Sequence, residues 1–272
     1  MKIDYISDLH LDFYVRHNGN EIKYKRNTLD FLESLLPDKL GEVIVIAGDI
    51  SHYNRQSYWT LEYFSQKYEQ VFFVFGNHDY YLISNKQRKE YRLNSKNREF
   101  ELMGMISHLL NVTLLWDFNL FDYGGVRFSG STSWYPLTEL KDYNFFKSTS
   151  NDSRLIHDLN ISSINYRELE AYDKLEDVDV IVTHVPPIII DSHHKHGGTS
   201  CYLNELKELK ANHYIFGHCH EQNVYEKDGA RFYINALGYP NEWMQNMNPL
   251  HYSKEQREEF KNKWNKIKSF EI

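Results

Sequence analysis

The stretch Phe75-Gly76-Asn77-His78-Asp79 decides how this sequence of 272 residues is interpreted. It closes a hydrophobic run (residues 71–75) that is short, β-branched and aromatic, which is typical of a buried strand. Gly76 lets the backbone turn sharply, and three polar residues follow at once. Open α/β sheets bind ligands at the carboxyl edge of their strands, so the three polar residues are candidates for a functional site. Taken alone, the pattern also fits a polar turn after a core strand.

Four further apolar runs of strand type end in the same way. They cover residues 3–6, 43–47, 178–182 and 213–216. Side chains that bind metals follow each run directly: Asp8 and His10, Asp49, His184, and His218 and His220. Asp8 and His10 are two residues apart, a spacing that points both side chains the same way on an extended segment. Five such endings along one sheet edge are difficult to assign to packing alone.

The segments between these runs predict an α/β protein. The β-α-β-α-β order of the first 75 residues implies a parallel sheet with right-handed crossovers. Gly124-Gly125 and Asp228-Gly229 each predict a hairpin. Apolar spacing predicts helices over residues 27–36, 56–68, 100–110, 155–174 and 203–209. The charged and polar residues 84–99 predict a solvated helix or a loop near the site, and a basic helix is expected over about 253–268. Residues 137–154 have no clear period and are expected to form a long loop.

Composition and charge narrow the classes of protein. The net charge of −7 gives no global basic field that would attract nucleic acid or acidic membranes, although a local basic patch is compatible with it. Two cysteines, Cys201 and Cys219, are too few for a disulfide framework and fit a reducing compartment. No apolar run has membrane-spanning length, and the N-terminus does not have the pattern of a signal peptide. We therefore expect a cytoplasmic protein with no membrane contact, and a single domain over residues 1–272.

The side chains at the strand ends suit a metal centre. Oxygen and imidazole donors without thiolate favour Mn, Fe, Zn, Co or Ni. Asn77 and the six side chains after the other four runs give seven donors. One ion does not need so many ligands, and one carboxylate can bridge two ions. Two metals about 3.5–4 Å apart clamp an in-line phosphoryl displacement and lower the pKa of a shared water. The expected cofactors are two divalent ions, manganese first, with iron, zinc, cobalt or nickel as alternatives.

Jointly, these motifs resemble those of the calcineurin-like metallophosphoesterases. The resemblance covers residues 1 to about 240 and rests on Asp8-Leu9-His10, Gly48-Asp49, Gly76-Asn77-His78-Asp79, His184 and Gly217-His218-Cys219-His220. It implies a four-layer α/β/β/α sandwich of two mixed sheets. The segments Thr183 to Pro187 and Asn235 to Tyr239 look like those of small bacterial and phage phosphoesterases.

The resemblance also implies a role for each site residue. The metal ligands fall into two sets that share one carboxylate: Asp8, His10 and His220 for the first metal, Asn77, His184 and His218 for the second, and Asp49 as the bridge. A metal-bridging hydroxide would be the nucleophile, and His78 would be the general acid near the leaving oxygen. His52 and Asp79 are further candidate catalytic residues. We expect His52 to pair with His78 or to touch phosphate, with an exposed turn residue as the alternative.

We therefore expect a metal-dependent hydrolase of phosphate esters. Its substrates could include nucleotides or nucleic acid. The sequence does not identify a stable protein partner. Preference for monoesters or diesters stays open. A nuclease of the same superfamily is the first alternative, favoured by His52 and by the basic residues at 86–92 and 254–268, but disfavoured by the net charge. An inactive interaction scaffold is the second, and it would need none of these ligands. The loop histidines His193, His194 and His196 receive no role.

Overall fold

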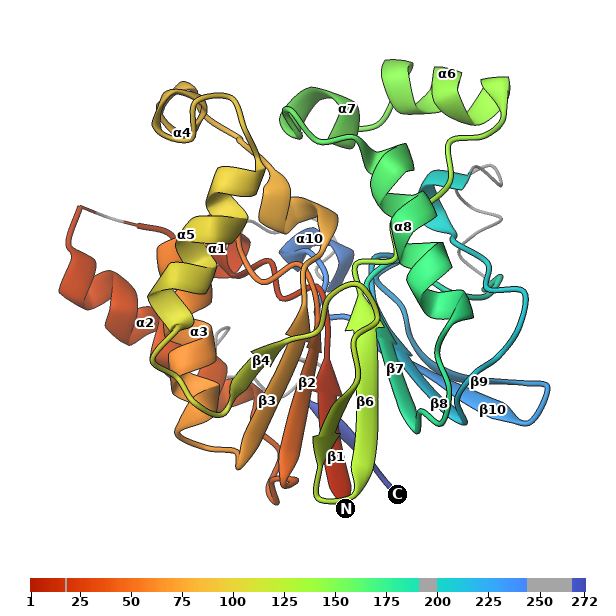
Figure 1. The fold of residues 1–272 in the computed structure, drawn as a ribbon. Coiled ribbons are helices and arrows are strands. Elements are labelled where there is room, and N and C mark those ends of the chain that lie inside the picture. Colours follow the sequence, from red (N-terminus) through yellow and green to blue (C-terminus); the bar gives the residue numbers. More distant parts are fainter. Residues whose placement is uncertain (18, 191–199, 244–265) are drawn as a thin grey trace.

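The computed structural model describes residues 1–17, 19–190, 200–243 and 266–272, and two mixed β-sheets form its centre (Figure 1). The strand order of the first sheet is β11 (Lys268–Glu271), β1 (Lys2–Ile6), β2 (Val43–Ala47), β3 (Gln70–Val74) and β4 (Val112–Leu114). That of the second is β5 (Phe121–Tyr123), β6 (Val126–Ser131), β7 (Val180–Thr183), β8 (His213–Phe216), β10 (Ala230–Asn235) and β9 (Gln222–Lys227). The predicted parallel pairing of β1, β2 and β3 is confirmed, and the antiparallel pairs lie at the sheet edges.

Side chains that point alternately to the two faces of each sheet divide the interior into layers. In β2, Ile44 and Ile46 pack toward the helices, whereas Val43 and Val45 belong to the cluster between the two sheets. Phe72 of β3 stacks on Phe128 of β6 across the same interface, with ring centroids 4.4 Å apart. Successive side chains of a strand point to opposite faces, so a strand that is apolar throughout serves both layers. The β-strands therefore lie in the middle of the molecule, covered on both outer faces.

Helices form the outer layers, which confirms the predicted four-layer α/β/β/α sandwich. Figure 1 shows α2, α3 and α5 beside the first sheet and α8 beside the second, and the apolar clusters agree with this placement. The helices are α1 (Leu11–Tyr14), α2 (Glu21–Leu35), α3 (Asn54–Ser65), α4 (Asn85–Glu90), α5 (Lys96–Ile106), α6 (Leu140–Ser148), α7 (Asp152–Leu155), α8 (Ile161–Asp173) and α10 (Pro240–Trp243), with 3₁₀ turns η1 (Asn77–Tyr80) and η2 (Ser200–Tyr202). Among the described residues, no helix has the length and apolar character of a membrane span.

Two sequence predictions in the middle of the chain are wrong. Residues 137–154 form not one long loop but include helices α6 and the start of α7, which follow each other closely. Residues 203–209 do not form a helix, because the backbone N–H groups of Asn204 and Leu206 donate to the carbonyls of Pro186 and Pro187, each at 3.0 Å. These bonds replace the i to i−4 bonds that a helix would need.

The boundaries of other elements also differ from those predicted. Helix α2 begins six residues before position 27, where the Asn20 side chain accepts from the backbone N–H of Lys23. Helix α8 begins at Ile161 instead of residue 155. Most of the predicted C-terminal helix lies outside the described residues, but its end is wrong: Lys268 opens strand β11, which pairs with β1.

Candidate metal centre

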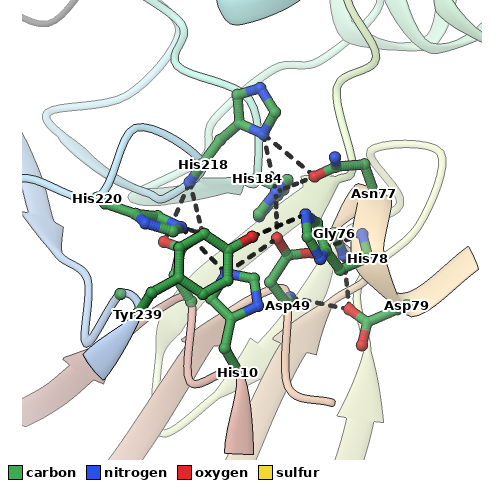
Figure 2. A network of polar contacts seen from close by, with 12 residues as sticks. His10, Asp49, Gly76, Asn77, His78, Asp79, His184, His218, His220 and Tyr239 are labelled. Carbon is green, nitrogen blue, oxygen red and sulfur yellow. Dashed lines mark hydrogen bonds and ion pairs between the residues drawn. The ribbon is translucent and has the colours of Figure 1, made fainter. Parts of the chain in front are cut away.

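The predicted ligands come from five loops that leave the carboxyl ends of β1, β2, β3, β7 and β8, and they converge on one place (Figure 2). In the first set, the Nε2 atoms of His10 and His220 lie 3.0 Å apart, and His220 Nε2 lies 3.6 Å from Asp8 Oδ1. Strands of both sheets contribute, because β1 belongs to the first sheet and the loop of His220 follows β8 of the second.

The second set converges more tightly. Asn77 Oδ1 lies 3.0 Å from His184 Nε2 and 3.2 Å from His218 Nδ1, and these two nitrogens are 3.3 Å apart. The Nδ1 atom of His184 faces the backbone carbonyl of Ala47 at 2.8 Å, which assigns the proton to Nδ1 and leaves the Nε2 lone pair directed at the cluster. One amide oxygen and two imidazole nitrogens therefore point at a common centre.

Asp49 lies between the two sets. Its Oδ2 atom is 3.7 Å from His10 Nε2 and 3.5 Å from His184 Nε2, so the same oxygen faces one donor of each set. Its Oδ1 atom accepts from the backbone N–H of His78 at 2.8 Å. This is the placement that a bridging carboxylate requires.

Left-handed backbone conformations aim the donors. Five of the seven predicted ligands have positive φ: Asp8, His10, Asp49, His218 and His220, with φ between 41° and 71°. Strand β1 ends at Ile6, so Asp8 and His10 do not lie on an extended segment as the sequence suggested. Their convergence comes from local turns, which residues with a Cβ adopt at an energetic cost and which concentrate at functional sites.

Two motif glycines make room for these donors. A Cβ on Gly76 would lie 2.1 Å from Asp49 Oδ1, so that carboxylate occupies the place of the missing side chain. The φ of Gly76 is −99°, which any residue can adopt, so the close approach and not the turn requires glycine there. Gly48 has φ +87°, and a Cβ on it would lie 2.5 Å from His184 Nδ1.

Burial gives this cluster an unusual charge balance. Asp8 and Asp49 are 0% and 1% exposed, and burial raises the pKa of Asp8 to about 6 and the pKa of Asp49 well above its usual range. Burial also lowers the pKa of His10 and His184 well below the usual value, so these imidazoles are neutral and offer lone pairs. Buried carboxylates facing neutral imidazoles call for a cation, and their donor set fits two ions of the Mn, Fe or Zn kind.

A chain of side chains lies beside the cluster. His52 Nε2 is 2.9 Å from His78 Nδ1, so the predicted contact between these two residues is present. The Asp12 carboxylate, which the sequence analysis did not single out, lies 2.8 Å from His52 Nδ1 and accepts from the backbone N–H of His52 at 3.1 Å. Burial alone would raise the pKa of Asp12, but the hydrogen bonds with His52 outweigh it and hold that pKa below the usual value. An ionised Asp12 therefore orders His52 against His78.

Asp79 is placed differently from the other candidates. Its carboxylate accepts from the backbone N–H groups of Asp49, Gly76 and Ile50, at 2.9, 2.8 and 3.2 Å. These bonds tie the loop after β2 to the loop after β3, and the Asp79 side chain does not line the pocket. We infer that Asp79 is a positioning residue for Asp49 and does not take part in the chemistry itself.

The profile of the calcineurin-like phosphoesterase family matches residues 1–222. The chain belongs to this family. An uncharacterized protein of Acanthamoeba polyphaga mimivirus is 26% identical in an alignment of 278 positions that covers 91% of this chain and 94% of that protein. The acyl-carrier-protein phosphodiesterase PptH of Mycobacterium tuberculosis is 23% identical in an alignment of 271 positions that covers 88% of this chain and 78% of PptH. The crystal structure of PptH, a phosphopantetheinyl hydrolase, matches with a TM-score of 0.59 at 19% identity, covering 91% and 94% of the two chains, and this likeness confirms the fold.

The pocket of this phosphoesterase has about 280 Å³ and is lined by Asp49, Asn77, His78, His218 and His220, among other residues. It is also lined by residues 149–152, from the end of α6 to the first residue of α7, and by Tyr202, Tyr239 and Glu242. Of these, the sequence analysis noted only Tyr239, in a segment that resembles small phosphoesterases; the others reach the site through the fold and carry no motif. The loop histidines His193, His194 and His196 lie outside the described residues.

Tyr239 and Glu242 act on the ligand histidines. Tyr239 stacks on His10 with ring centroids 4.4 Å apart, and its hydroxyl lies 3.3 Å from His78 Nε2 (Figure 2). The Glu242 carboxylate lies 2.8 and 2.9 Å from His220 Nδ1. Burial lowers the pKa of His220, but this hydrogen bond and the charge of Asp8 raise it above the usual value overall. A carboxylate behind a ligand histidine fixes its ring and directs the other nitrogen at the metal.

Proposed function

We propose that this chain is a phosphodiesterase that uses two divalent cations, held by the two donor sets and bridged by Asp49. The observation that carries the proposal is the place of Asp49 Oδ2, within 3.7 Å of a donor nitrogen from each set. Membership of the phosphoesterase family supports the reaction class. When bound, two such cations supply Lewis acidity at phosphorus and lower the pKa of a water that they share.

The chain's own residues orient the ester and move one proton. His78 Nε2 faces the pocket beside the Tyr239 hydroxyl, and His78 donates a proton from this atom to the leaving oxygen. Burial and the neighbouring histidines lower the pKa of His78 well below its usual value. The negative charge of a phosphate ester opposes this effect, since a nearby anion favours the imidazolium form. Protonation of His78 is thereby linked to substrate binding.

The preference for diesters rests on the relative PptH, whose name describes an acyl-carrier-protein phosphodiesterase. A diester with a large alcohol on one side also needs an open site. Residues 149–152 and Tyr202 line the pocket together with the donor residues and offer surface to that alcohol. A phosphopantetheinyl group on a carrier protein is the substrate that we place first, after the description of PptH. A nucleic acid, the alternative that His52 raised in the sequence, is the second.

The test begins with cation content. The loaded wild type should contain two cations per chain, and Asp49→Asn, which removes the bridging charge, should weaken both sites together. Activity should then be compared on bis-nitrophenyl phosphate, nitrophenyl phosphate, a phosphopantetheinyl carrier protein and single-stranded DNA. We expect the diesters to be turned over faster than the monoester. One cation in a fully loaded wild type, or loss of a single site in Asp49→Asn, would contradict the dinuclear assignment. Faster turnover of the monoester would contradict the diester assignment.

A further inference from the structure

The Asn77 side-chain amide can bind a cation in only one of its two orientations. Its oxygen has lone pairs, whereas its NH2 group has hydrogen atoms and cannot act as a ligand. The oxygen faces the nitrogens of His184 and His218, as described above. The NH2 group points the other way and donates to Asp152 Oδ1 at 2.8 Å and to the Tyr81 hydroxyl at 3.1 Å.

We propose that Asp152 is a positioning residue that locks the Asn77 amide with its oxygen toward the second cation. The proposal rests on the proposed function, because it assigns a cation to the donor set of Asn77. A carboxylate can only accept hydrogen bonds, so it excludes the rotated amide, whose oxygen would face the Asp152 oxygen. A serine or an asparagine at position 152 could donate and would tolerate both orientations.

The surroundings of Asp152 hold its carboxylate in place. The hydroxyls of Tyr81 and Tyr135 both donate to it, and the residue is 4% exposed. Within the described part of the chain, Asp152 forms no ion pair with lysine or arginine. Three neutral donors, the two hydroxyls and the Asn77 NH2 group, surround this buried carboxylate. A hydrogen bond from the amide to a carboxylate polarises the amide and increases the electron density on its oxygen, which strengthens the oxygen as a ligand.

Asp152 reaches the site from a distant part of the chain. It is the first residue of α7 and lies 75 positions from Asn77 in the sequence. The contact between α7 and η1 also has structural value, so a loss of stability alone would not distinguish the two roles. Cation affinity distinguishes them, because a purely structural contact does not act on the amide orientation.

The experiment is calorimetric titration of the chelated protein with Mn²⁺, for wild type, Asp152→Asn and Tyr135→Phe. Tyr135→Phe is the matched control, since it removes one hydrogen bond from the same carboxylate and leaves the bond to Asn77. We expect Asp152→Asn to weaken one of the two cation sites by about 10–100-fold, with the other site unchanged, and Tyr135→Phe to stay close to wild type. If circular dichroism shows that Asp152→Asn does not fold, Asp152→Ser carries the same expectation.

A rescue variant makes the test sharper. A carboxylate at position 77 can ligate in either orientation, so Asn77→Asp combined with Asp152→Asn should recover most of the lost affinity. Two intact sites in Asp152→Asn would overturn the proposal and leave the proposed function standing. Equal losses in Asp152→Asn and Tyr135→Phe would also overturn it, because they indicate a structural role. Fewer than two cations on the wild type would overturn both the proposed function and this inference.

Discussion

Replacing Asp12 by asparagine tests how the proton on His78 is controlled. The two oxygens of Asp12 accept from two groups of His52, its backbone N–H and its Nδ1–H. With Nδ1 protonated, His52 Nε2 is an acceptor, and it can take the Nδ1–H of a protonated His78. Asparagine has one acceptor, so the bond to His52 Nδ1 is either lost or reversed. Reversal turns His52 Nε2 into a donor and keeps His78 neutral, which makes it a poor acid.

The expected loss follows from the bond that is removed. A hydrogen bond to a charged group contributes about 1.5–3 kcal/mol to a buried site. At about 1.4 kcal/mol for each tenfold change in rate, the loss lies between about 10-fold and 150-fold. This loss reaches only the lower end of the range of about 10²–10⁴-fold that general acid catalysis supplies, as expected for a change that leaves His78 itself in place. Only esters whose leaving group needs a proton should show the full loss of rate.

The assay measures kcat/KM for a nitrophenyl diester and an alkyl diester in wild type, Asp12→Asn and His52→Gln, with cation content determined for each. Nitrophenolate leaves without much help, whereas an alkoxide requires the proton of His78. Asp12→Asn should therefore lose far more activity on the alkyl ester than on the nitrophenyl ester. The double variant Asp12→Asn/His52→Gln should lose little activity beyond either single variant. A uniform loss on both esters with cations intact, or additive losses in the double variant, would refute the reasoning.

Three further predictions concern cations, packing and pH. After chelation, Mn²⁺ should restore activity well and Mg²⁺ poorly at the same free concentration, because imidazole-rich sites disfavour Mg²⁺; equal rescue would argue against the ligand assignment. Gly76→Ala should displace the Asp49 carboxylate and weaken both cation sites in a titration, whereas Gly104→Ala, in open space on α5, should stabilise the fold by about 0.5–1 kcal/mol. Burial raises the pKa of Glu168 from 4.5 to about 7. Its contribution to stability is therefore full below the lower value and is lost as pH rises through the higher one. Between about pH 5 and pH 8, the free energy of unfolding measured in urea should fall by about 2.5 kcal/mol more for wild type than for Glu168→Gln. Parallel pH curves would disprove this.

The central strands and most predicted ligands could be located from the sequence for a simple physical reason. A strand that is buried on both faces needs an unbroken apolar run, and a glycine or polar residue that ends the run is visible locally. The residues that follow β3 illustrate this, since Gly76 and Asn77 stand directly against the apolar run. Each run marked its own strand. Parallel pairing brought the ends of β1, β2 and β3 together in the first sheet and those of β7 and β8 in the second, and the packing of the two sheets placed the two groups side by side.

The supporting residues could not be located in this way. Asp12 and Asp152 act through contacts whose partners lie 40 and 75 positions away, and no local period marks such a contact. Helix α6 escaped detection because Leu140 and Tyr143, which lie on its apolar spacing, are exposed, so only part of that spacing is buried. Strand β11 has four residues, and Phe270 is its one strongly apolar side chain; its stacking on Tyr233 at 4.1 Å shows what holds it.

The backbone at the ligands explains why the donors could be named before their geometry was known. Asp8, His10 and Asp49 adopt left-handed conformations. Asp and His adopt such conformations more often than most residues that have a Cβ, but each still costs of order 1–3 kcal/mol, so residue identity alone does not dictate them. The surrounding sheets impose them: the backbone N–H of Asp8 donates to Gly48, that of His10 donates to Asp49, and the carboxylate of Asp79 holds Asp49 from the other side. Motif residues therefore supply the donor atoms, while pairing between distant loops supplies their direction. A cation bound at the centre would offset both the backbone strain and the buried negative charge, because it is the one partner that all of these donors share.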